Sequence, residues 1–309
     1  MTNAAPAVPG AGPLAAYSEA LASIVETVGR SALAVPGRHR HGLASAVVWR
    51  PGIVVTAAHV FRHPPAAVSL VGPDGKIIEA TLAGIDTPTD VAVFRVAEEG
   101  AAPAQLGDPS TLKAGSVVIA VGRSAGGDPT ASYGIVNRSS GPWETWLGGQ
   151  LDRMIRLDGG IYEGLSGAPV ADASGAIIGI ASSALSRSYG MVVPAATVNR
   201  VVDSLLSKGH VARAFLGVSA QPVPLGLGQE GVGLLVTGLV PGGPAQAAGL
   251  MVGDILVSVD GKPAASLHEL RQGLADRVGQ PVVIRLQRGG VATELALTVG
   301  QWPTERRGC

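Results

Sequence analysis

A long series of short β-type runs between residues 31 and 195 constrains this chain more than any other feature. The runs recur about every ten residues between Gly, Pro, Asp and Ser, which is typical of an antiparallel barrel or sandwich. No helix of convincing length interrupts them, which disfavours a parallel α/β fold. The runs are Ala44–Trp49, Ile53–Thr56, Val68–Val71, Ile77–Leu82, Val91–Val96, Val117–Val121, Met154–Leu157, Ala176–Ile180 and Met191–Val193.

Helical spacing of apolar residues marks the segments around this series. A first helix is expected over Leu14–Val28 and a second over Thr197–Lys208, each followed by glycine. A smaller β-rich unit begins near Phe215 and holds a helix from Leu267 to about Val278. We therefore expect a disordered segment 1–13, a barrel domain with its N-terminal helix at 14–208, a second domain at 214–300 and a tail at 301–309.

Composition excludes several classes of partner. Lys and Arg total 23, as do Asp and Glu, so the net charge is zero, which disfavours nucleic acid and anionic membranes. No window approaches the roughly 20 apolar residues of a membrane span. Cys309 is the only cysteine and no secretory signal is visible, so a cytoplasmic location is expected, or a periplasmic one if the start site is mis-set. No cofactor motif or metal-ligand set is seen, so we expect neither a cofactor nor a metal.

Three residues have contexts suited to nucleophilic catalysis. His59 directly follows an apolar strand, Asp90 precedes an alternating strand, and Ser166 lies between Gly164 and Gly167. Each context alone has a structural explanation, as a buried histidine, a turn aspartate or an ordinary glycine turn. Together, in the order His, Asp, Ser, they supply a base, an acid that orients it and a nucleophile. The glycine turn also suits backbone N–H groups that converge on an oxyanion.

These motifs resemble the HtrA (high-temperature-requirement) family of serine proteases over residues 14 to about 300. His59 in TAAHV, Asp90 in TDVAVF and Ser166 in EGLSGAPV match the catalytic positions of that family. The stretches LDGGI, YGMVVP and RAFLGV match the approach to the nucleophile, the specificity loop and the entry to a PDZ domain. The later runs Val240–Ala245, Val252–Leu256 and Ser258–Pro263 resemble the central signature of PDZ domains.

The resemblance implies two six-stranded antiparallel β-barrels of the chymotrypsin type, followed by a β-rich PDZ domain with one main helix. It implies that Ser166 attacks, His59 transfers the proton and Asp90 fixes the imidazole, with N–H groups of Gly164 and Ser166 as the oxyanion hole. An apolar S1 pocket and a peptide-binding PDZ groove are also implied. The S1 residues are Ile161, Met191, Val192 and Val193, and the groove residues are Phe215, Leu216, Gly217, Val218, Leu267 and Leu270.

The sequence departs from the family pattern beside the nucleophile. Leu165 and Ala168 stand where the family usually has Asn and Gly, and Leu43-Ala44-Ser45-Ala46 replaces the usual Gly-Ser-Gly. Leu165 fits if its side chain points away from the cleft. Ala168 strains the turn if its backbone needs a positive φ.

The resemblance implies a serine endopeptidase that degrades unfolded or misfolded proteins and whose PDZ domain binds peptide C-termini or extended peptides. The alternatives are an inactive protease-fold scaffold that recognises peptides through its PDZ domain, and a chaperone-like holder of unfolded chains. The resemblance also implies a homotrimer formed through the helix around Tyr17.

Overall fold

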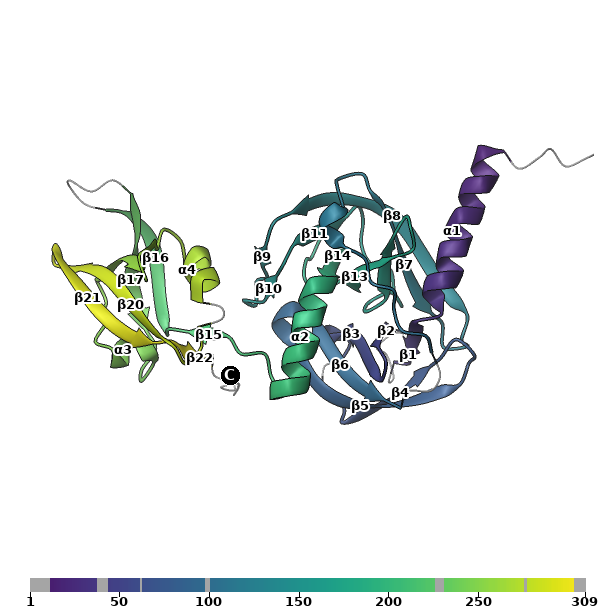
Figure 1. Ribbon diagram of the computed structural model, residues 1–309, viewed down its shortest axis with the longest axis horizontal. Helices are drawn as coiled ribbons and strands as arrows, with labels where there is room; N and C mark the ends of the chain where they lie inside the picture. Colours follow the sequence, from purple (N-terminus) through teal and green to yellow (C-terminus); the bar gives the residue numbers. More distant parts are fainter. Residues whose placement is uncertain are drawn as a thin grey trace, which may run out of the picture. The chain divides into compact units, whose positions relative to one another are not determined.

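The computed structural model describes residues 12–37, 44–61, 63–97, 101–225, 231–274 and 277–302 (Figure 1). They form two compact units that divide between Val211 and Ala212, called unit one and unit two below. The segments expected at 1–13 and 301–309 lie almost wholly outside the described residues.

The first barrel of unit one is closed by antiparallel strands in the order β1-β2-β3-β6-β5-β4. Strands β2 and β3 are buried along nearly their whole length, because one face lines the barrel and the other packs on the rest of unit one. Leu33, Leu70 and Phe94 fill the interior. The strands are β1 (Ala32–Val35), β2 (Ala44–Arg50), β3 (Ile53–Ala57), β4 (Ala67–Val71), β5 (Ile77–Asp86) and β6 (Val91–Val96).

The second barrel is closed in the order β11-β14-β13-β12-β7-β8. Its interior holds a separate apolar cluster that includes Val136, Ile155 and Ile178. A short hairpin of β9 (Trp143–Glu144) and β10 (Gln150–Leu151) connects β8 with β11. The barrel strands are β7 (Val117–Arg123), β8 (Pro129–Ser140), β11 (Met154–Leu157), β12 (Pro169–Asp172), β13 (Ile177–Ser182) and β14 (Met191–Pro194).

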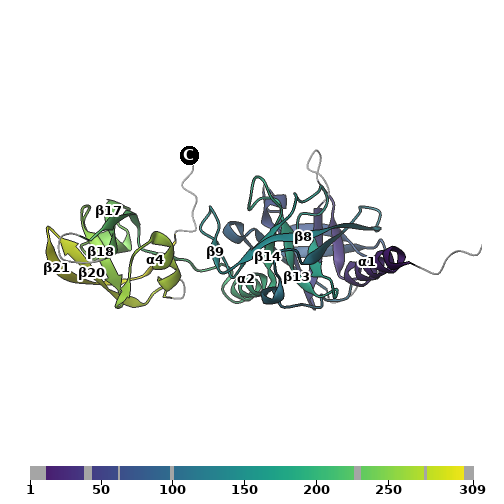
Figure 2. The same ribbon diagram turned by 90° about the horizontal axis from the view of Figure 1, so that it is seen from above.

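Two helices complete unit one (Figures 1 and 2). Helix α2 (Ala195–Lys208) packs on β5 and β6 of the first barrel and on β13 and β14 of the second, and ends where Gly209 takes a positive φ of 73°. Its apolar face joins a cluster shared by both barrels, and Trp49 in that cluster donates from Nε1 to Oδ1 of Asn199 at 2.9 Å. Helix α1 (Pro13–Gly29) packs mainly through its C-terminal part and leaves Leu14 80% exposed.

Unit two is a sheet in the order β16-β17-β18-β20-β21, with β19 paired to β18. Its core gathers around Leu234, Leu256 and Ile284. A separate two-stranded ladder joins β15 (Ala214–Phe215) to β22 (Gly300–Gln301). The remaining elements are β16 (Val218–Pro224), β17 (Val232–Leu239), α3 (Pro244–Ala247), β18 (Ile255–Val259), β19 (Lys262–Pro263), α4 (Leu267–Leu274), β20 (Pro281–Arg288) and β21 (Val291–Thr298).

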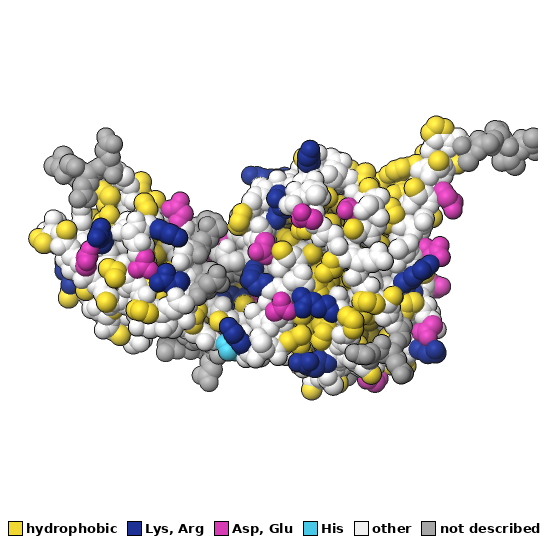
Figure 3. Space-filling model, in the orientation of Figure 1, with side chains coloured by type: hydrophobic (Ala, Val, Ile, Leu, Met, Phe, Trp, Pro, Cys, Tyr) yellow, Lys and Arg dark blue, Asp and Glu magenta, His cyan; other side chains and the backbone are white. Residues whose placement is uncertain are grey.

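The expected fold class is confirmed: two closed six-stranded barrels are followed by a β-rich unit. Helix α4 is described over Leu267–Leu274, residues 275 and 276 lie outside the described residues, and Arg277 is not helical. The N–H of Glu269 donates to Ser266 Oγ at 3.1 Å and so caps the start of this helix. Figure 3 shows Lys and Arg side chains interspersed with Asp and Glu on the visible face. Among the described residues, no helix has both the length and the apolar character that a membrane crossing requires.

Candidate active site

Strands β3 and β6 bring His59 and Asp90 together at one end of the first barrel. His59 lies in the 3-10 turn η1 (Ala58–Val60) after β3, Asp90 immediately precedes β6, and the strand ends pair at Ala57 and Val91. Nδ1 of His59 lies 2.8 Å from Oδ2 and 3.0 Å from Oδ1 of Asp90. The carboxylate therefore favours the tautomer with the proton on Nδ1, which leaves Nε2 as an acceptor.

Hydrogen bonds of its N–H and its C=O fix the backbone of Asp90. Its φ of 60° and ψ of 41° are left-handed, a conformation that Asp and Asn adopt more readily than other non-glycine residues. Its N–H donates to Thr87 O and its C=O accepts from Ala58 N–H, both at 3.1 Å. Thr89 Oγ1 donates to the buried Asp86 carboxylate at 2.5 Å. These contacts hold the acid in a conformation that would otherwise cost about 1 kcal/mol.

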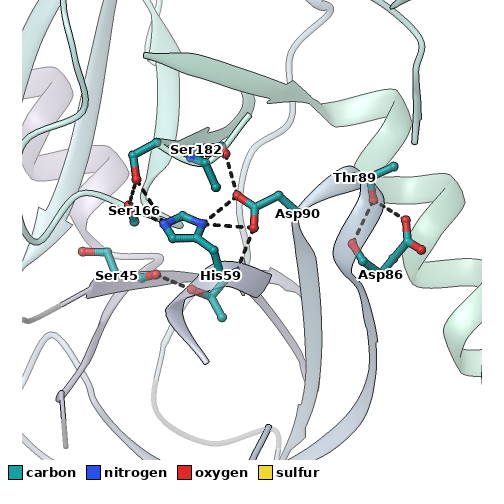
Figure 4. A network of polar contacts seen from close by, with 10 residues as sticks. Ser45, His59, Asp86, Thr89, Asp90, Ser166 and Ser182 are labelled. Atoms are coloured by element: carbon teal, nitrogen blue, oxygen red, sulfur yellow. Dashed lines mark hydrogen bonds and ion pairs between the residues drawn. The ribbon is translucent and has the colours of Figure 1, made fainter. Parts of the chain in front are cut away.

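Ser166 approaches the same imidazole from the second barrel (Figure 4). It lies in the connection between β11 and β12, and its Oγ is 3.1 Å from Nε2 of His59. The structure thus brings together the three residues that the sequence motifs single out. The hydroxyl, the imidazole and the carboxylate form one continuous hydrogen-bonded chain across the two barrels.

Two consecutive serines at the end of β13 join this chain of hydrogen bonds, and no sequence motif predicted either of them. Ser182 is fully buried, and its Oγ donates to Asp90 Oδ2 at 2.5 Å. Ser183 is exposed, and its Oγ lies 3.0 Å from Ser166 Oγ and 3.1 Å from His59 Nε2. One serine therefore supports the acid, whereas the other shares the base with the nucleophile.

The backbone before Ser166 forms a tight turn. The N–H of Leu165 donates to Tyr162 O at 3.1 Å, and Gly164 has a φ of 87°. Gly164 is the third residue of this four-residue turn, and a positive φ there is typical of a type II turn. In a type I turn, the peptide between the second and third residues would be rotated by about 180°. Among the described residues, the N–H groups of Gly164 and Ser166 donate to no protein acceptor. Both donors of the expected oxyanion hole are thus unoccupied.

Ser45 of the first barrel clamps this turn. Its side chain is completely buried, its Oγ donates to Gly164 O at 2.7 Å, and its N–H donates to Ser166 O at 2.9 Å. The Ser45 hydroxyl in turn accepts from the N–H of Arg123 at 3.2 Å. A Cβ at Gly167 would lie 2.3 Å from Ser45 O, so only glycine permits this close approach.

Arg123 connects the clamp to helix α1. Its buried guanidinium donates to the carbonyl oxygens of Ala32, Gly127 and Gly29, the last residue of the helix. Burial lowers the pKa of this guanidinium, although the charge of Asp128 opposes that effect. Arginine nonetheless stays charged, because a guanidinium does not lose its proton in proteins.

The β9–β10 hairpin supports the acid from the opposite side. Thr145 Oγ1 donates to Pro88 O at 2.7 Å and accepts from Gly149 N–H at 2.9 Å. A Cβ at Gly149 would lie 2.1 Å from Pro88 O, so the hairpin touches the segment that leads into Asp90. Trp146 at the hairpin tip is 74% exposed.

The two departures beside the nucleophile leave the turn unstrained. The Leu165 side chain is buried in the core of the second barrel and so points away from Ser166. Ala168 has no positive φ, because among the described non-glycine residues only Asp90 and Asp260 do. Its Cβ therefore adds no backbone strain.

The S1 prediction needs correction for three residues. The side chains of Met191, Val192 and Val193 are 2%, 0% and 0% exposed. Side chains alternate along a strand, so Val192 packs inside the second barrel, whereas Met191 and Val193 pack in the apolar cluster shared with α2. None of these three side chains presents surface to a substrate. Ile161 does, and its Cδ1 would lie 2.9 Å from a Cβ placed at Gly190.

The predicted PDZ residues divide between core and loop. Leu216 and Leu270 are buried in the core of unit two, with Leu267 and Val218 packed partly against it. The Phe215 ring contacts Trp302 edge-on with centroids 5.1 Å apart. Gly217 has a φ of 75°, and the N–H groups of Leu216 and Gly217 donate to no acceptor among the described residues. These two donors are free for a carboxylate.

Comparison with known proteins agrees with this geometry. Residues 44–180 match the trypsin-like peptidase domain family, and residues 235–288 match the PDZ domain family. The solved structure of the HtrA-type protease AlgW with a decapeptide is 29% identical, with a TM-score of 0.75 over 85% of this chain and 83% of that one. The serine endoprotease from Yersinia pestis is 25% identical, with a TM-score of 0.76 over 91% and 98%.

A Chlamydia trachomatis protein named "Probable periplasmic serine endoprotease DegP-like" is 32% identical over 270 residues, which cover 84% of this chain and 54% of that protein. The chain is thus similar to HtrA-type and DegP-like serine endoproteases. It spans about half the length of such curated relatives. Among its described residues, the chain has no group of three or more His, Cys, Asp or Glu side chains that could hold a metal ion.

The expected cytoplasmic location is contradicted by the same comparison. Curated relatives of this chain are named periplasmic. The expectation relied on the lack of a visible signal and of a disulfide, and neither decides the compartment, since proteins without disulfides also work in oxidising compartments.

Proposed function

We propose that this chain is a serine endopeptidase. The observation that carries the proposal is the hydrogen-bonded chain from Ser166 Oγ through His59 to the buried Asp90 carboxylate, with links of 3.1 and 2.8 Å. These distances let a proton pass between the hydroxyl and the imidazole. The peptidase domain is proposed at residues 14–208 and the PDZ domain at 214–300.

The geometry supports an acyl-enzyme mechanism. His59 Nε2 takes the proton of Ser166 as Oγ attacks the scissile carbonyl, and Asp90 stabilises the imidazolium that forms. The free N–H groups of Gly164 and Ser166 receive the oxyanion. His59 then protonates the leaving amine and later activates the water that releases the acyl group.

The proposed substrates are unfolded or misfolded polypeptides. A cleft of this kind needs an extended segment, which an unfolded chain supplies. Ile161, five residues before the nucleophile in the chain, is apolar and has accessible surface, so cleavage after a small or medium aliphatic residue is expected. Peptides with Val or Ala before the cleaved bond should be cut faster than peptides with Lys; the reverse order contradicts an apolar pocket.

The PDZ domain is proposed to bind the carboxyl end of a peptide. The support is the pair of free N–H groups at Leu216 and Gly217, beside the half-buried Val218 and Leu267. Replacing the terminal carboxylate of a bound peptide by an amide should weaken binding at least tenfold, as fluorescence polarisation would measure. Equal binding of acid and amide forms argues against a carboxylate site.

Assembly into a homotrimer through α1 is also proposed. Tyr17 and Tyr133 meet edge-on with centroids 6.4 Å apart and stay 42% and 60% exposed, beside the exposed Leu14. Exposed aromatic pairs of this kind are typical of protein interfaces. Light scattering of the wild type and of Tyr17→Ser tests it, and a monomeric wild type contradicts it. We propose the periplasm as the compartment, by analogy with the named relatives.

Labelling with a fluorophosphonate tests the central proposal. The wild type should be labelled and should degrade casein, whereas Ser166→Ala should do neither. Failure of the wild type to label or to degrade any unfolded protein instead supports an inactive scaffold or a chaperone-like holder. Circular dichroism of both proteins establishes that the loss does not come from unfolding.

A further inference from the structure

Arg123, the last residue of β7, is a buried arginine that bonds three backbone carbonyl groups. It is 3% exposed, and its Nε donates to Ala32 O at 2.7 Å. Its Nη1 donates to Gly127 O in the connection between β7 and β8, and its Nη2 donates to Gly29 O at the end of α1. One side chain therefore joins the last residue of the N-terminal helix, the first residue of β1 and the β7–β8 connection.

The position of α1 and the position of the Arg123 side chain depend on each other. The C-terminus of a helix carries a partial negative charge, which a guanidinium neutralises. No described carboxylate forms an ion pair with Arg123, so the three carbonyl groups take the place of a counter-ion. A buried charge costs free energy unless such bonds satisfy it. Departure of the helix end would therefore leave this guanidinium with an unsatisfied donor.

The backbone of the same arginine reaches the oxyanion turn through Ser45. The N–H of Arg123 donates to Ser45 Oγ at 3.2 Å, and Ser45 Oγ donates its own proton to Gly164 O at 2.7 Å. A hydroxyl carries one hydrogen, so the bond that it accepts helps to direct the bond that it donates. A hydrogen-bonded path thus runs from Gly29 O through Arg123 and Ser45 to the turn with the expected oxyanion donors.

The end of β7 has no room to move independently of this turn. A Cβ at Gly122 would lie 2.6 Å from Ser45 Oγ and 2.8 Å from Leu165 Cδ2. The residue before Arg123 thus packs against both the clamp and the residue before the nucleophile. A shift of this strand end would be passed on to Ser45 and Leu165, because close-packed interiors transmit displacement.

We propose that Arg123 is a positioning residue that makes the geometry of the oxyanion turn depend on the seating of helix α1. The inference rests on the proposed endopeptidase activity and adds to it a residue that does not touch the substrate. With Gly29 O in place, the guanidinium holds the end of β7, and the Arg123 N–H directs the Ser45 hydroxyl to Gly164 O. Without the guanidinium, the N–H groups of the turn are less well aligned for the oxyanion.

Arg123→Met tests this role, because methionine is also long and unbranched but donates no hydrogen bond. Its kcat for a short chromogenic peptide, per site labelled by a fluorophosphonate, should fall about fivefold, with KM unchanged within about twofold. Loss of folded protein would lower the number of labelled sites instead. Arg123→Lys keeps the charge but reaches fewer carbonyl groups, so its kcat should lie between those of the wild type and the Met variant.

Arg50→Met is the matched control. Arg50 lies at the end of β2 and donates to Asn199 Oδ1 and Asp203 Oδ1 of α2, at 2.6 Å each, so it joins the other helix of unit one to the first barrel. Its replacement should leave kcat per labelled site unchanged. An equal fall in both Met variants overturns the proposal, since any arginine that joins a helix to a barrel would then have the same effect.

The double variant Ser45→Ala/Arg123→Met tests the path. If Arg123 acts through Ser45, the double variant should be no slower than Ser45→Ala alone within about twofold, whereas independent effects would multiply. Multiplied effects overturn the path, and an unchanged kcat in Arg123→Met overturns the positioning role. If the Met variant does not fold, Arg123→Lys replaces it in the same comparison.

Ile24→Ser tests the part of the helix. Ile24 is a partly buried residue of α1 that packs against the core of unit one. Its replacement should lower kcat about threefold in the wild type but leave the kcat of Arg123→Met unchanged, because the coupling is already absent there. Equal slowing in both backgrounds overturns the dependence on Arg123. A wild type that no fluorophosphonate labels instead overturns the endopeptidase proposal itself, and this inference with it.

Discussion

Ser182 Oγ donates to Asp90 Oδ2 at 2.5 Å, and the same carboxylate oxygen lies 2.8 Å from Nδ1 of His59. The buried acid is therefore held by a neutral donor on one side while it orients the base on the other (Figure 4). Without the Ser182 hydroxyl, the carboxylate keeps its charge but loses a contact that fixes its rotation.

Ser182→Ala should lower kcat/KM about tenfold, because a hydrogen bond to a charged group is worth about 1.5 kcal/mol or more. Ser182→Thr keeps the hydroxyl and should retain most activity. Steady-state cleavage of a short chromogenic peptide measures both variants. A Thr variant as slow as the Ala variant would show that packing at this buried site, and not the hydroxyl, matters.

Ser183→Ala should speed acylation about threefold. Neutral His59 has one lone pair on Nε2, and Ser183 Oγ competes for it with Ser166 Oγ at an equal 3.1 Å. Removal of a competing hydrogen bond of about 0.7 kcal/mol leaves the imidazole to the nucleophile alone. The rate of fluorophosphonate labelling measures this step, with Ser186→Ala as a control in the same loop. Slower labelling of Ser183→Ala would instead mean that Ser183 assists proton transfer.

Ser45→Ala should reduce kcat about tenfold with little change in KM. The hydroxyl fixes Gly164 O, in the peptide that lies between the two expected oxyanion donors, the N–H groups of Gly164 and Ser166. The charge that these donors receive exists only in the transition state. Ser45→Thr keeps a hydroxyl but adds a methyl to a site with no free space, so its folding is checked separately. A rise in KM without a fall in kcat would contradict the role in positioning the turn.

Gly149→Ala should destabilise unit one by about 2 kcal/mol, as overpacking of a tight contact does. The new Cβ would meet Pro88 O at 2.1 Å and displace the segment before Asp90, so activity should fall as well. Gly141→Ala is the control near the same hairpin, because no atom lies within 4 Å of its added Cβ. Urea unfolding of the two variants gives the comparison, and equal stabilities would rule out the steric argument.

A fall in pH should lower the free energy of unfolding of unit two, because Asp254 becomes protonated. Arg288 donates to both carboxylate oxygens, at 2.8 and 2.7 Å, and these bonds lower the pKa of Asp254 in spite of its burial. The unfolded chain therefore binds this proton more readily than the folded one, so the stabilisation is complete above about pH 4 and is lost as pH falls through the lowered pKa.

Asp254→Asn should remove this part of the pH dependence and lower stability at neutral pH. Calorimetry between pH 3 and 7 follows the transition. The control is Glu294→Gln, which breaks an exposed pair with Arg285 and should change little. If the stability of Asp254→Asn falls with pH as that of the wild type does, other carboxylates cause the loss of stability in acid.

The sequence predicted the parts of this structure that depend on local pattern. Alternating apolar runs identified most barrel strands. Places beside apolar strands identified His59 and Asp90, and a glycine turn identified Ser166. Strand β8 was not predicted because its polar residues and Gly134 obscure the alternation, and β16 was not predicted because two prolines interrupt its pattern.

The supporting residues could not be predicted, because their partners are distant in the chain. Ser182 lies 92 residues from Asp90, and Ser45 lies 119 residues from Gly164. Lone serines in such positions carry no local signal. Three of the four predicted S1 residues, Met191, Val192 and Val193, were misplaced for a related reason: an apolar strand shows which residues are buried, but not which of its faces meets a cavity.

The left-handed backbone at residue 90 also bears on how this chain could lose its activity over evolutionary time. Most other residues at position 90 would be strained by the positive φ, whatever the chemistry of their side chains. Glutamate would also place a longer side chain in a buried site. Asparagine alone matches both the shape and the backbone preference while it removes the charge. If the proposed activity is lost, the first replacement at that position is therefore expected to be asparagine, with the fold intact and the histidine in the wrong tautomer.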